Sequence, residues 1–288
     1  MRFNEKQAEE ERKRRLIAQV YDLNKLNPKK IKELTLRDRL FLSSLIRSRM
    51  DENFNYIQKL YKHETEVSPS NEYTLEMVRS LISNSLLKVH PSSTIDCFED
   101  KEDFPQTFFT FYVNYHINVE LIHKDKKRTM EFLTYPSPDS FLIDKEFCYE
   151  MWREIALEEC KQYLTYSLMK VGFELSIGEK TIAVLNYLLD NFSTGQIYSI
   201  IYSSINGAVR FYHEKRVNKK HAANSVITNM QRNGEKAITD ANWVIRNYSR
   251  IPELPQSALS EVFYNQILQI GVKGFNNKPS YDFIPTTD

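Results

Sequence analysis

Residues 145–171 read KEFCYEMWREIALEECKQYLTYSLMKV, and this stretch decides the fold class. Its apolar residues recur every three or four positions, the spacing that places side chains on one face of an α-helix. We expect one long helix that ends before Gly172. The residues that mark its buried face are Cys148, Met151, Trp152, Ile155, Cys160, Leu164, Leu168 and Val171.

The same periodicity continues from this helix to the end of the chain. Apolar residues at helical spacing predict further helices at 182–189, 197–209, 219–237 and 257–271. Ser193 or Thr194 is expected to cap the second of these, because a hydroxyl oxygen can accept a hydrogen bond from a free N–H at a helix start. Residues 145–288 are therefore predicted to form a helical carboxy-terminal region.

The amino-terminal half combines helical patterns with one strand pattern. Helices are predicted at 5–24, from about 36 onward, and at 74–89. From Phe109 to Leu121 apolar residues occupy every odd position, the alternation of a strand buried on one side. Residues 123–128 are expected to form a loop and 129–135 a returning strand. The predicted fold is mainly α, with one long antiparallel β-hairpin at about 107–135, and the predicted domains are 1–144 and 145–288.

Composition argues against several classes of protein. The chain has 288 residues with 39 Lys and Arg against 38 Asp and Glu, so its net charge of +1 gives no overall bias toward nucleic acid or membrane. Its seven glycines form neither G-x-G nor G-x-x-x-x-G-K, which argues against Rossmann enzymes, P-loop NTPases and kinase-type loops. No cofactor is expected.

The cysteines and the absence of long apolar stretches suggest a compartment. Cys97, Cys148 and Cys160 form no CxxC motif and no even set, which is typical of a reducing environment. The start of the chain is highly charged and does not resemble a secretory signal. The longest uncharged window, residues 191–209, is interrupted by polar side chains, so no membrane span is expected. The predicted location is cytoplasmic.

Positive and negative residues are sorted into separate stretches. Residues 1–50 hold 14 Lys and Arg against 7 Asp and Glu, whereas residues 92–160 hold 7 against 15. The densest basic cluster is Arg12, Lys13, Arg14 and Arg15, which could track phosphates. The alternative is a solvated helix face paired with its own glutamates at 9–11.

A second basic segment begins the helix predicted at 219–237. Lys219 and Lys220 follow a short basic turn, and Asn224 and Arg232 lie on the less apolar side of the helix. A helix, a short turn and a basic helix with amide side chains are the layout of a helix-turn-helix reader of DNA. Helical hairpins without DNA contact are the competing interpretation.

An acidic row follows the long central helix. Glu146, Glu150, Glu154 and Glu158 are spaced by four, where like charges repel, so a basic segment of this chain or of another protein could dock there. An ordinary exposed helix face is the alternative, because the row winds around the helix.

Signals for catalysis are weak. The histidines form no H-E-x-x-H or zinc spacing, so no metal site and no catalytic residue are predicted. Pro138-Asp139 and Glu159-Cys160-Lys161 match the spelling of a family of metal-dependent nucleases. In those enzymes the second element lies on a strand, whereas here it falls in a helical window. A divergent nuclease is therefore the third hypothesis.

The last third of the chain resembles an uncharacterised helical module of bacterial hypothetical proteins. The similarity rests on residues 193–198, 219–224, 255–257 and 271–275. It implies a bacterial or mobile-element origin but no chemistry, and no site residue is transferred from it.

The favoured hypothesis is a non-catalytic, nucleic-acid-associated accessory protein that binds DNA or RNA. Its predicted contacts are Arg12, Lys13, Arg14, Arg15, Lys219, Lys220, Asn224 and Arg232. The alternative is a protein-interaction or assembly module in which acidic and basic helices pair, with Glu146, Glu150, Glu154 and Glu158 as the acidic contacts.

Overall fold

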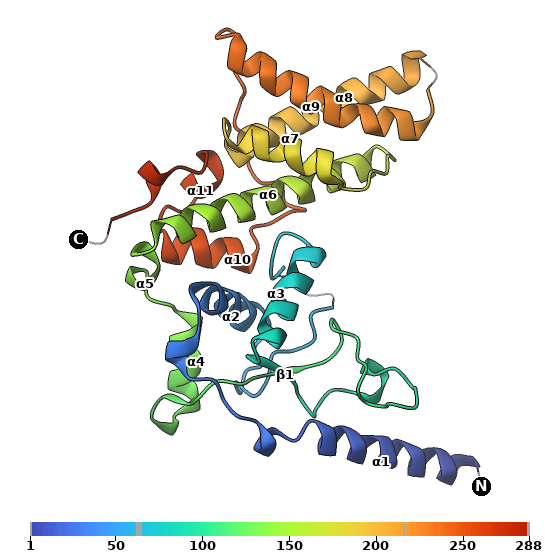
Figure 1. Cartoon of the computed structure of the whole chain (residues 1–288). Helices are drawn as coiled ribbons and strands as arrows, with labels where there is room; N and C mark the ends of the chain where they lie inside the picture. Colours follow the sequence, from blue (N-terminus) through green and yellow to red (C-terminus); the bar gives the residue numbers. More distant parts are fainter. Residues whose placement is uncertain (1, 62–64, 216, 287–288) are drawn as a thin grey trace. The chain divides into compact units, whose positions relative to one another are not determined.

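The computed structural model describes residues 2–61, 65–215 and 217–286, and the chain divides into two compact units (Figure 1). The amino-terminal unit covers residues 1–136 and the carboxy-terminal unit residues 137–288. The division lies before α5 (Asp139–Leu142), whereas the sequence placed it at residue 145. Phe141 of α5 is buried, its ring lies 6.0 Å from the ring of Phe147, and its carbonyl accepts a hydrogen bond from Cys148.

The amino-terminal unit contains α1 (Arg2–Val20), α2 (Leu36–Arg49), α3 (Asn71–Ser83) and α4 (Lys126–Thr134). Thr35 starts α2 with a reciprocal capping box to Asp38, which lowers the cost of the free N–H groups at the helix start. The buried core of the amino-terminal unit includes residues of α2 and α3, namely Leu40, Leu42, Leu45, Met77 and Leu81.

The strands of this unit are β1 (Leu87–Val89) and β2 (Tyr115–Ile117), which pair antiparallel. The mainly α fold with one antiparallel strand pair is thus confirmed. The position of the pair differs from the expected 107–135 hairpin, because the partner of β2 comes from a stretch expected to end a helix. Ser85 has a φ of 61°, which ends the helical path after α3 and allows residues 87–89 to extend.

The expected returning strand at 129–135 is helix α4 instead. The Asp125 carboxylate accepts a hydrogen bond from the Arg128 N–H and so caps the helix start. Met130 and Leu133, three residues apart, are buried on one face. Because Asp125 lies inside a charged run that is typical of a loop, the sequence pattern does not reveal this helix start, and the predicted strand at 129–135 is wrong.

His116 of β2 makes the stability of this unit depend on pH. Burial, together with the smaller effects of the nearby charges of His90 and Lys126, lowers the pKa of His116 to about 4. Below about pH 6.5 His116 binds a proton in the unfolded chain but stays neutral in the folded chain. The free energy of unfolding therefore decreases as the pH falls toward 4.

Because His116 is partly exposed, we expect this loss to be about 1–2 kcal/mol between about pH 7 and pH 4.5. Urea denaturation followed by circular dichroism should show a smaller loss in His116→Asn than in the wild type, and the remaining loss is expected from His90, whose pKa burial also lowers. His123→Asn is the matched control at an exposed histidine and should keep the wild-type dependence. Equal pH dependence in wild type and His116→Asn would contradict the assignment.

The carboxy-terminal unit is built around α6 (Lys145–Lys170), α7 (Glu179–Leu189), α8 (Thr194–Lys215) and α9 (Lys219–Thr239). Figure 1 shows α8 and α9 side by side as a hairpin, held in part by Asn233, which donates a hydrogen bond to Ser204. Trp152 is fully buried, and its indole N–H donates to the Gly274 carbonyl at 2.8 Å.

The last elements are shorter than the helix expected at 257–271. They are α10 (Ala258–Glu261), a π-helical turn η5 (Val262–Ile267) and α11 (Lys273–Asn276). Gln269 and Gly271 both have positive φ and break the helical path between η5 and α11. Among the described residues, none of the helices is long and apolar enough to span a bilayer.

Candidate nucleic-acid interface

The basic cluster on α1 is largely satisfied within its own unit. Arg12 donates two hydrogen bonds to Glu9, and these lower the pKa of the Glu9 carboxyl. Lys13 forms an ion pair with Asp100 at 2.6 Å and lies 5.4 Å from the centre of the Phe104 ring. Arg14 donates to a backbone carbonyl at 2.9 Å. Three of the four predicted cationic contacts therefore already have partners.

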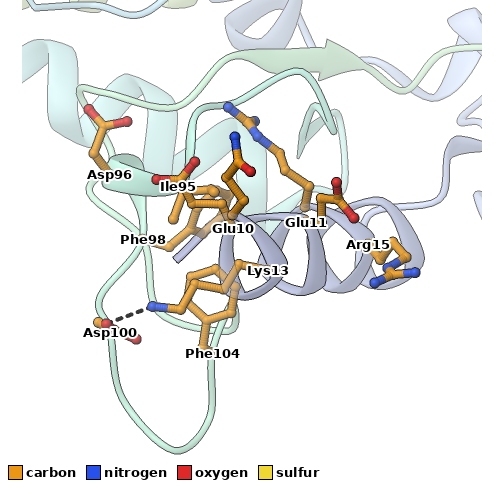
Figure 2. A pocket seen from close by; sticks show the side chains of 11 residues that line it. Glu10, Glu11, Lys13, Arg15, Ile95, Asp96, Phe98, Asp100 and Phe104 are labelled. Carbon is orange, nitrogen blue, oxygen red and sulfur yellow. Dashed lines mark ion pairs between the residues drawn. The ribbon is translucent and has the colours of Figure 1, made fainter. Parts of the chain in front are cut away.

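A groove of about 1020 Å³ beside this cluster carries both signs of charge. Figure 2 shows α1 lying across the segment that contains Asp96, Asp100 and Phe104, with Lys13 reaching toward Asp100. Glu10 and Glu11 line the same groove as Arg15. Because carboxylates lie beside the cations in this groove, a polyanion would be repelled as well as attracted. The groove is therefore a poor phosphate-binding surface.

The start of α9 has a different character. Asn218 caps the helix by accepting a hydrogen bond from the His221 N–H at 2.8 Å. Lys219 and Lys220 follow it, and both are exposed and form no ion pair within the described residues. With Asn224 they line a groove of about 690 Å³ whose other wall is the segment from Gly172 to Ser176, which includes the exposed carboxylate of Glu174.

One face of α9 continues from this groove along the helix. Lys220, Asn224, Thr228 and Gln231 are exposed and spaced by four, four and three, which puts them on one line. At 1.5 Å per residue the line is about 17 Å long. Arg232 is exposed beside it and donates to Asn229 at 3.1 Å. The opposite face is buried through Ala222, Ala223, Val226, Ile227 and Met230.

The structure therefore joins three of the four predicted residues of this segment in one groove, and places Arg232 farther along the same helix. Hydrogen-bonding amides, a hydroxyl and two cations without carboxylate partners are groups that can contact bases and phosphates. Lys215, at the end of α8, is also exposed.

The acidic row on α6 does not share one exposed face. Glu146 and Glu150 are exposed, and Glu146 accepts a hydrogen bond from the Tyr281 hydroxyl. Glu154 is partly buried and has an interaction of its own. Glu158 is 7% exposed and pairs with Lys161 at 2.6 Å. The carboxylates thus turn toward the interior as the helix proceeds.

The two carboxylates of the nuclease spelling also lie in different environments. Asp139 is exposed at the start of α5, whereas Glu159 is 1% exposed and pairs with Arg250 at 2.8 Å. Across residues 2–61, 65–215 and 217–286 there is no group of three or more His, Cys, Asp or Glu side chains that could hold a metal ion.

The cysteines offer no activated nucleophile. Cys97, Cys148 and Cys160 are buried and unbridged. Burial raises the pKa of the Cys148 thiol to about 12 and also raises that of Cys160, so both remain protonated near neutral pH.

Comparisons of this chain with protein-family models, with curated proteins and with solved structures find no significant match.

Proposed function

We propose that this chain is a non-catalytic nucleic-acid-binding protein whose contact surface is the start and the exposed face of α9. The observation that carries the proposal is the pair Lys219 and Lys220, exposed and without carboxylate partners beside Asn224. The basic cluster at Arg12 is expected to contribute less to binding, because its cations already bond to Glu9, Asp100 and a backbone carbonyl.

The dimensions of α9 suit the major groove of a DNA duplex. An α-helix fits a groove about 12 Å wide, and the first turns of a recognition helix contact base edges. Lys219 and Lys220 would lie near the phosphates, while Asn224, Thr228 and Gln231 would face the bases. Buried, unbridged cysteines support a reducing compartment such as the cytoplasm, and the sequence resemblance supports a bacterial or mobile-element origin.

Charge reversal at the start of α9 tests the proposal. Fluorescence anisotropy would compare duplex DNA, single-stranded DNA and single-stranded RNA of about 20 nucleotides across a salt series of about 50–200 mM. We expect Lys219→Glu/Lys220→Glu to weaken binding at least about tenfold and to reduce the log–log salt slope by about 2, since two phosphate contacts are lost.

Lys180→Glu/Lys273→Glu is the matched control, with the same change of net charge on exposed residues of α7 and α11. It should bind within about twofold of the wild type. Glutamates in the first turn of α9 complement the helix dipole, so the test variant should not melt at a lower temperature. The proposal fails if none of the three probes binds in a salt-dependent way, or if the control loses as much affinity as the test variant.

A protein-interaction module is the second candidate, and a separate observation in the amino-terminal unit favours it. Tyr61, Phe109 and Tyr112 are each more than 40% exposed and form one aromatic cluster. The rings of Tyr61 and Tyr112 stack with centres 4.9 Å apart, and Phe109 meets Tyr112 edge-on at 6.2 Å. Exposed aromatic clusters are typical of protein contacts. This role predicts self-association or partner binding that the α9 charge reversal leaves unchanged.

A further inference from the structure

The amino-terminal unit contains a mostly apolar pocket of about 330 Å³ that the proposed nucleic-acid contact does not use. It lies beside β2 and the start of α4. Pockets of this size with an apolar lining and a few polar groups are the usual form of small-molecule sites. The apolar residues that define its body are Met50, Phe54, Ile117, Val119, Leu121 and Met130.

The polar residues that line the pocket are Lys126, His116, Asn55 and Tyr56. Lys126, the first residue of α4, donates a hydrogen bond to the Asn55 side-chain oxygen at 2.7 Å. Lys126 forms no ion pair, and the ring nitrogens of His116 form no hydrogen bond, within the part of the chain that the structure describes. None of the residues that line the pocket is acidic. Its polar side therefore offers a cation and a neutral imidazole to an anionic group.

One carboxylate in this part of the unit is Asp51, whose charge acts on His90, the neighbour of His116. Asp51 is 9% exposed and accepts hydrogen bonds from the backbone N–H groups of Asn53, Asn55 and Tyr56. These N–H groups already satisfy its charge, and Asp51 does not line the pocket. The charge of Lys126 is thus available to a ligand.

Backbone strain occurs in the two segments that frame the pocket. Phe54, which lines it, has a φ of 58°. His123 and Lys124, with φ of 52° and 60°, lie between the lining residues Leu121 and Lys126. Residues other than glycine rarely adopt a positive φ, and strained residues of this kind cluster at ligand sites.

We propose that this pocket binds a small monocarboxylate with a flat or branched apolar body, its carboxylate facing Lys126 and His116. The volume is about twice that of the 150 Å³ cavity that holds benzene, so a fused bicyclic ring fits. The proposal is independent of nucleic-acid binding, because its residues belong to the other unit.

Titration of the full chain with 2-naphthoate tests the proposal, with 2-naphthamide as the uncharged analogue. Labelled methionine methyl groups report the location by NMR. We expect the signals of Met50 and Met130 to shift, while those of Met151, Met169 and Met230 in the carboxy-terminal unit stay in place. The naphthamide should bind at least about tenfold more weakly than the naphthoate.

Lys126→Met tests the charge, and Lys127→Met is its matched control on the adjacent exposed residue. We expect Lys126→Met to weaken naphthoate binding about tenfold and to leave naphthamide binding unchanged, with Lys127→Met within about twofold of the wild type. Leu121→Trp, at a residue 42% exposed, should block both ligands. The proposal is overturned if the signals of Met151, Met169 or Met230 shift, or if no binding is seen at about 5 mM. It is also overturned if the two ligands bind with equal affinity, or if the two lysine variants weaken naphthoate binding equally.

Discussion

Glu159→Leu is expected to lower the free energy of unfolding of the carboxy-terminal unit by about 3–5 kcal/mol. The Glu159 carboxylate is 1% exposed and accepts hydrogen bonds from Ser260 and Arg250. Leucine would leave the guanidinium of Arg250, which is only 20% exposed, without a counter-charge. An unpaired charge in an apolar interior is among the most destabilising changes a single substitution can make. Urea denaturation followed by the fluorescence of the buried Trp152 measures the loss.

A double-mutant cycle separates the ion pair from simple loss of packing. Arg250→Leu alone should also destabilise the unit, because the Glu159 charge is then left buried and unpaired. The double variant Glu159→Leu/Arg250→Leu should recover most of the loss, since neither charge remains. If the double variant instead loses the sum of the two single losses in free energy of unfolding, the interaction between Glu159 and Arg250 does not contribute to stability.

Gly274→Ala is expected to destabilise the same unit by about 2–3 kcal/mol. A Cβ atom at Gly274 would lie 2.5 Å from two ring atoms of Tyr264, closer than real side chains approach. The Tyr264 ring is fully buried and packs edge-on against Trp152 at 6.3 Å, so it has little room to move. The helix carrying Gly274 must therefore shift and weaken the hydrogen bond from Trp152 to its carbonyl.

Gly207→Ala is the matched control for this substitution, and its expected sign is opposite. Gly207 lies within α8, and the nearest atom to its added Cβ would be 3.4 Å away on Asn229. Because alanine favours helix over glycine, this variant should gain about 0.5–1 kcal/mol. The argument from close packing fails if both alanine variants change the free energy of unfolding in the same direction.

Sequence periodicity predicted the helices well and the strands poorly, for a physical reason. The buried face of α6 follows from spacing alone, because neighbours along a helix are neighbours in the sequence. Val171, which was also expected on that face, lies just beyond the helix and is 38% exposed. The partner of Tyr115 in the strand pair is Val89, and nothing in the local pattern of either segment indicates that pairing. Residues 87–89 therefore looked like the end of a helix, although β2 was correctly expected to be extended.

The candidate sites show the same division between local and long-range information. That Lys219 and Lys220 begin an exposed helix face could be predicted from the sequence. That Lys13 pairs with Asp100 could not, since the two residues lie in segments far apart in the chain. The pocket at His116 could not be predicted from the sequence, because Met50, Val119 and Met130 meet only in the folded unit.

The burial of the three thiols gives each unit its own chemical reporter. Cys97 belongs to the amino-terminal unit, and Cys148 and Cys160 belong to the carboxy-terminal unit. An alkylating reagent reaches a buried thiol only when the surrounding structure opens. Mass spectrometry of the labelled peptides would therefore record the opening of one unit separately from the other in the intact chain.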